Sequence, residues 1–134
     1  MRILAFIIAI YSPVMLVIHV STAKILRTWK QPDSWISRWF PPRCALRVEG
    51  VFWLLALASW FLWRSLAWKI LVIVFAVIHL AIWAADEFRV SRKDGPAFTV
   101  SPAVTRAIVV FDAVEAVVLA GIGTVAIMYL VQGG

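Results

Sequence analysis

Four ionisable side chains stand inside apolar stretches of this sequence: His19, His79, Asp112 and Glu115. Imidazole and carboxylate groups are ligands that zinc and non-haem iron prefer in proteins. The same groups can also take up and release protons. Because an ionisable group in an apolar helix is costly to bury, such residues are functional candidates wherever they occur.

The four residues lie at a similar depth along three separate apolar stretches. Each is five to nine residues from the nearest flanking charged residue. At about 1.5 Å of rise per helical residue, all four groups fall within about 7–14 Å of one boundary. Asp112 and Glu115, three positions apart, share a helix face, and Glu49 is placed to close the ring. The spacing therefore predicts one polar layer to which several helices contribute.

Three kinds of site fit this layer. A divalent metal ion such as zinc or non-haem iron could be held by His19, His79, Asp112 and Glu115. The two histidines alone could ligate a haem or a chlorophyll-type pigment within a helical bundle. Asp112, Glu115 and Glu49 could instead form a proton relay. The sequence lacks the local motifs of metalloproteases, phosphate-binding loops and serine hydrolases. Purely structural pairing of the carboxylates with histidines or basic residues would leave the same pattern, so all of these alternatives stay open.

One short segment has a counterpart in known proteins. The segment Phe75–Leu80, and to a lesser degree Val17–Thr22, places one histidine within an apolar run. It resembles the segment through which light-harvesting polypeptides bind bacteriochlorophyll, and the resemblance implies a pigment ligand at His79. Those polypeptides have a single span and other loops, so the chain is not assigned to their family.

The composition indicates a membrane protein. The chain has 134 residues, of which 63% are apolar and 15% charged, and its mean hydropathy is +0.94. Soluble domains are about 45–50% apolar and about 25% charged, and disordered chains are less hydrophobic still. A span needs about 20 residues, so the chain has room for four spans. The single Cys44 excludes an intramolecular disulfide and a cysteine-based zinc or iron–sulfur site.

The apolar runs predict an all-α integral membrane four-helix bundle built from two helical hairpins. We expect a single domain, 1–134, with spans at about 3–22, 49–63, 67–85 and 106–131. The run from Val51 to Ala85 is too long for one span, so the chain is expected to reverse near residues 64–69. The first run has features of a cleaved signal peptide, but its length and the basic residues after it favour a retained span.

The first loop is predicted to contain a short amphipathic helix at about 33–40. Asp33 can cap it, and its aromatic residues gather on one face. Such a helix either lies in the membrane interface or docks on a partner subunit. A stripe of small residues in the last span also suits close helix packing. The predicted interface residues are Trp35, Trp39, Phe40, Ala116, Ala120 and Thr124.

The distribution of basic residues predicts the orientation. Ten Lys and Arg residues lie on the side of the first and third loops, and three lie on the other side. The positive-inside rule then places both long loops in the cytoplasm and both termini outside, as in a bacterial inner membrane. Attraction to anionic lipid explains the net charge of +6, so no nucleic-acid partner is expected.

The leading functional expectation is an accessory subunit of a larger membrane complex concerned with electron or proton transfer. It rests on the small size, on the lack of a soluble catalytic domain and on the many tryptophans. Under this expectation the chain itself is not an enzyme. The expected partners are membrane lipid and either other membrane subunits or further copies of the chain. The alternatives are a small proton-coupled transporter acting as an oligomer and a membrane metalloenzyme.

Overall fold

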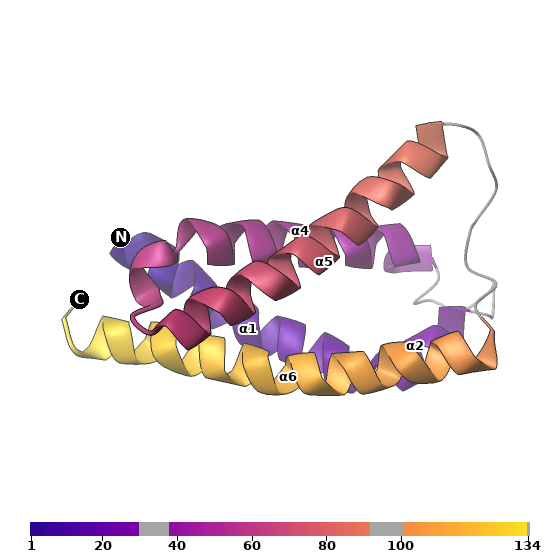
Figure 1. The fold of residues 1–134 in the computed structure, drawn as a ribbon. Helices are drawn as coiled ribbons and strands as arrows, with labels where there is room; N and C mark the ends of the chain where they lie inside the picture. Colours follow the sequence, from indigo (N-terminus) through magenta and orange to yellow (C-terminus); the bar gives the residue numbers. More distant parts are fainter. Residues whose placement is uncertain (30–37, 92–100, 134) are drawn as a thin grey trace.

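The computed structural model describes residues 1–29, 38–91 and 101–133, and every regular element in these ranges is helical (Figure 1). The all-α prediction is therefore confirmed for the described residues. The elements are α1 (Arg2–Val20), α2 (Thr22–Trp29), α4 (Pro42–Ala58), the short 3-10 helix η1 (Trp60–Leu62), α5 (Leu66–Ser91) and α6 (Pro102–Val131).

The long helices form two antiparallel pairs. α1 packs mainly on α6, and α4 packs mainly on α5. The two termini lie at the same end of the molecule (Figure 1), where the Arg2 guanidinium donates to the carbonyl of Gly133 at 2.5 Å. The pairs are joined where the Tyr11 hydroxyl of α1 donates to the Val48 carbonyl of α4 at 2.9 Å. All the long helices can therefore contribute side chains to one interior.

Three helices are long and apolar enough to cross a membrane: α1, residues Leu66–Phe88 of α5, and α6. They correspond to the first, third and fourth expected spans, so the membrane character of the chain has support from length and composition. The structure differs from the expectation in the second span. That segment is α4, whose 17 residues begin at Pro42 and not near residue 49.

The early start of α4 has a local cause. Pro42 is at the first helical position, where its fixed φ favours a helix and its missing N–H costs nothing. The first turns of α4 are then held to α5 by ion pairs, with Arg43 Nε 3.6 Å from Asp86 Oδ2 and Arg47 Nε 2.7 Å from Glu87 Oε1. Charged residues that suggested a loop are thus part of the helix.

The interior is apolar and rich in aromatic rings. Among its fully buried members are Phe52, Trp53, Trp63, Leu119 and Ile122. The chain reverses between η1 and α5 without glycine or proline. The Trp63 indole, 1% exposed, donates to the Ala56 carbonyl at 2.9 Å, and this contact fixes the end of α4 against the core.

Most of the predicted interfacial helix at 33–40 lies outside the described residues, Trp35 included. Trp39 is helical and its side chain is exposed. The small-residue stripe of α6 is covered only in part, since Ala116 is buried while Ala120 and Thr124 are exposed. Close packing of α6 on α1 instead occurs at Gly123, where an added Cβ would lie 3.2 Å from Ser12 Cβ.

Gly50 permits the close approach of α4 to α5, because a Cβ built on Gly50 would overlap the Trp83 ring. We predict that Gly50→Leu destabilises the protein by about 1–3 kcal/mol, the usual cost of overpacking. The neighbouring Val51→Leu, at a 42% exposed position, is the matched control. Thermal unfolding in detergent should show a lower midpoint for Gly50→Leu alone. Equal midpoints for the two variants would contradict the described packing of α4 on α5.

Candidate metal centre

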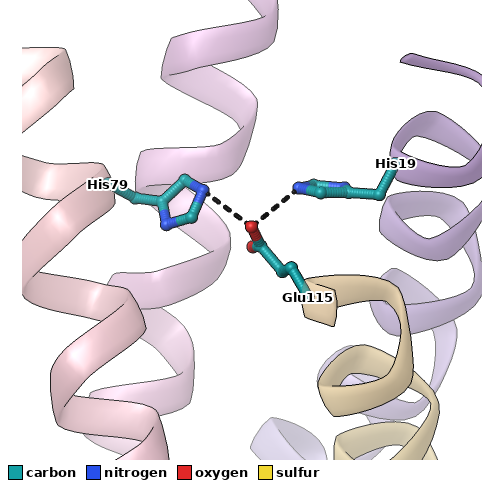
Figure 2. A group of neighbouring side chains, drawn as sticks. All are labelled: His19, His79 and Glu115. Carbon is teal, nitrogen blue, oxygen red and sulfur yellow. Dashed lines mark ion pairs between the residues drawn. The ribbon is translucent and has the colours of Figure 1, made fainter. Parts of the chain in front are cut away.

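Four helices each contribute one side chain to a buried layer. His19 comes from the last turn of α1, Trp53 from α4, His79 from α5 and Glu115 from α6. Figure 2 shows both imidazole rings pointing at the Glu115 carboxylate from opposite sides. His19 is 3% exposed, His79 5%, and Glu115 and Trp53 are fully buried. The layer is therefore inside the bundle and shielded from solvent.

One carboxylate oxygen lies between the two imidazoles. Glu115 Oε2 is 3.2 Å from His19 Nε2 and 3.1 Å from His79 Nε2. All three ligand atoms lie within 4.8 Å of one another. Both are ion-pair distances, and Oε2 has no hydrogen-bond partner among the described residues besides these two imidazoles. A fully buried carboxylate oxygen is costly unless a proton on a neighbouring nitrogen or a cation satisfies it.

The remaining polar atoms of the three side chains are held by neighbouring groups. His19 Nδ1 is 2.8 Å from the Met15 carbonyl oxygen, and His79 Nδ1 is 2.8 Å from the Phe75 carbonyl oxygen. A carbonyl oxygen can only accept, so each Nδ1 carries the hydrogen and donates it. Glu115 Oε1 accepts from the Trp53 indole at 3.0 Å. Each group is thus oriented with its free atom toward the centre.

The hydrogen bonds at the two Nδ1 atoms determine which charges the centre needs. When each Nδ1 carries a hydrogen, a neutral imidazole presents a lone pair at Nε2. Two such lone pairs would then face the carboxylate oxygen, and three acceptors cannot satisfy one another. Either two added protons or one divalent cation removes the conflict, and both give the three residues together a net charge of +1.

The two nitrogen–oxygen distances are compatible with a small metal ion held by the three residues. A tetrahedral zinc ion with bonds of about 2.0–2.1 Å holds its ligands about 3.3 Å apart, and both nitrogen–oxygen distances are close to this spacing. Two histidines and one carboxylate are a donor set of catalytic zinc sites and of non-haem iron sites. Histidine ligands commonly donate their other ring N–H to a carbonyl, as His19 and His79 do.

The same geometry argues against a haem or chlorophyll-type pigment held by both histidines. The Glu115 carboxylate occupies the space between the two Nε2 atoms where the macrocycle would have to lie.

Two carboxylates that were expected in the same layer, Asp112 and Glu49, lie outside the triad of His19, His79 and Glu115. Asp112 was expected among the metal ligands, but it is outside the cluster of His19, His79 and Glu115, and its Oδ2 accepts from the Thr22 hydroxyl. Glu49 lies on α4, one turn before Trp53. Both line a cavity beside His79. The structure thus separates the expected layer into a triad and a second polar level.

Trp53 was not among the predicted site residues. Its indole donates to Glu115 Oε1, and its ring stacks on His79 at 5.5 Å between centroids. A signal was present, because a tryptophan buried in an apolar helix needs an acceptor for its N–H. Its spacing of four from Glu49 also places it on the inward face.

Comparison with known proteins gives no relative: no family model, curated protein or solved structure matches the chain. The function must therefore be argued from the arrangement of His19, His79 and Glu115.

Proposed function

We propose that this chain is a small integral membrane protein that binds one divalent transition-metal ion, of the zinc or ferrous iron class, through His19, His79 and Glu115. The observation that carries the proposal is Glu115 Oε2, which is fully buried, has an imidazole Nε2 about 3 Å away on either side, and has no further hydrogen-bond partner among the described residues. A bound cation satisfies this oxygen and both nitrogen lone pairs at once.

The donor set determines the class of ion. Calcium and magnesium prefer oxygen ligands, and usually more of them than one carboxylate supplies. Imidazole nitrogen suits zinc, iron, nickel and copper, and two nitrogens with one carboxylate oxygen suit zinc and ferrous iron in particular. The described protein residues supply three ligands, and this number is typical of catalytic sites that keep one position for water or substrate.

The chain's own residues prepare the centre before any ion binds. The carbonyls of Met15 and Phe75 fix the tautomer and rotation of the two imidazoles. The Trp53 indole donates to Oε1 of Glu115, so the other oxygen, Oε2, points at the two imidazoles. When bound, a zinc-class ion supplies Lewis-acid chemistry or joins α1, α5 and α6 in one cross-link.

We further propose a four-span topology in which α4 with η1 forms the additional span. An even number of spans agrees with the two termini lying at one end of the molecule. The ten basic residues of the loop side favour cytoplasmic loops and external termini in a bacterial inner membrane. The exposed apolar faces of α1, α5 and α6 then contact lipid.

A second candidate function is proton binding by the same three residues. Their distances are those of ion pairs, and two protons satisfy the centre as well as a cation does. Asp112 and Glu49, one helical turn away, would extend the path in a proton-coupled transporter. An accessory subunit of a larger complex is compatible with either function, and no described contact favours it over them.

Metal content separates the two candidates. We predict about one zinc or iron per chain in protein purified without chelator, and at least a tenfold loss in Glu115→Gln, which keeps the size of the side chain but removes a ligand charge. Asp112→Asn is the control, since it neutralises a carboxylate of the same helix outside the triad. Elemental analysis by mass spectrometry measures the ratio. Wild-type protein that binds no metal even after reconstitution would overturn the metal proposal and favour proton binding.

The contact between Trp53 and Glu115 should tune the affinity. We predict that Trp53→Phe weakens metal binding 10–100-fold, the usual effect of losing a group that orients a ligand. Trp63→Phe is a matched control, because Trp63 is equally buried but donates to the Ala56 carbonyl, away from the triad. Competition with a chromophoric chelator reports both affinities. Equal affinities in the two variants would mean that Trp53 does not orient the carboxylate.

A further inference from the structure

A cavity of about 380 Å³ lies next to the triad, among residues of α1, α2, α4, α5 and α6. It borders on the triad through His79. Most of its lining consists of aliphatic side chains, joined by the ring of Phe111. A cavity of this size with an apolar wall and a few polar groups is typical of a site for a small organic molecule.

Four polar side chains reach the cavity wall: Thr22, Glu49, His79 and Asp112. The hydroxyl of Thr22 is already used, because it donates to Asp112. His79 is used at both ring nitrogens, toward the Phe75 carbonyl and toward Glu115. The polar groups left to meet a ligand are the carboxylates of Glu49 and Asp112, which come from two different helices.

The ion pairs of the described residues join neither carboxylate to a Lys or Arg side chain, and the basic groups that act on both are the imidazoles of His19 and His79. Arg43 and Arg47 pair with Asp86 and Glu87, neither of which lines the cavity, and no described Lys or Arg lines the cavity wall. Carboxylates in an apolar enclosure need a proton or a positive charge beside them. The cavity is thus complementary to a positive group on an apolar body.

We propose that the cavity binds an organic cation with a compact apolar body, its ammonium group between Glu49 and Asp112 and its body against the aliphatic wall. A hydrated inorganic ion would match the carboxylates but leave the apolar wall against water. A neutral apolar molecule would match the wall but leave the carboxylates without a partner. This site adjoins the metal centre at His79, but its ligand would be held by Glu49 and Asp112 and not by the three residues of the triad.

Three probes with one body and different charges test the proposal: 1-adamantylammonium, 1-adamantanol and 1-adamantanecarboxylate. Isothermal titration of the full chain in a neutral detergent should give the highest affinity for the ammonium, weaker binding of the alcohol and none of the carboxylate. Because this comparison uses wild-type protein, no variant has to fold for it to be decisive. Equal affinities, or a preference for the carboxylate probe, would overturn the proposal.

Variants then assign the site to its residues. The double variant Glu49→Gln, Asp112→Asn should bind the ammonium at least tenfold more weakly, while its affinity for the alcohol stays unchanged. Asp86→Asn, which neutralises a carboxylate outside the cavity, is the control. Unchanged ammonium binding in the double variant would place the cation elsewhere and overturn the assignment. Metal content measured on the same wild-type samples keeps the two proposals distinct, because metal-free protein that still prefers the ammonium overturns only the metal centre.

Discussion

The structure depends on the burial of one carboxylate. Glu115 is fully enclosed by four helices, and removing a charged group from water costs several kcal/mol unless other groups compensate. The compensation is divided among the helices: α4 gives the Trp53 indole, while α1 and α5 give His19 and His79. Since any of these helices would leave a buried polar group unsatisfied if it moved away, the centre constrains how the pair of α1 and α6 packs on the pair of α4 and α5.

Other packing contacts bring the helices close enough to form the triad. Gly123 lets α6 come close to Ser12 of α1, and Gly50 lets α4 come close to the Trp83 ring of α5. Aromatic rings fill the space next to the triad, with Trp53 between Phe75 and His79 at centroid distances of 5.5 Å each. Such close packing keeps the imidazoles in one orientation, which a site for a small ion requires.

Much of this centre was predictable, and the errors have physical causes. Ionisable residues at one depth on three apolar stretches identified His19, His79 and Glu115. Asp112 was included because residues three apart share a broad helix face, but they differ by about 60° around the axis, enough to turn Asp112 toward Thr22. The contribution of Trp53 depends on which way α4 faces, and this is set by tertiary packing. The start of α4 was misplaced because Pro41 and Pro42 mark both the end of one helix and the beginning of the next.

The central claim is that His19, His79 and Glu115 bind one metal ion directly. X-ray absorption spectroscopy at the zinc edge, on protein reconstituted with one equivalent of zinc, tests it most directly. The account predicts nitrogen and oxygen neighbours at about 2.0–2.2 Å, with the outer-shell scattering of two imidazoles, and loss of the imidazole signal in the double variant His19→Ala, His79→Ala. Zinc surrounded only by water oxygens, or bound through the sulfur of Cys44, would contradict it.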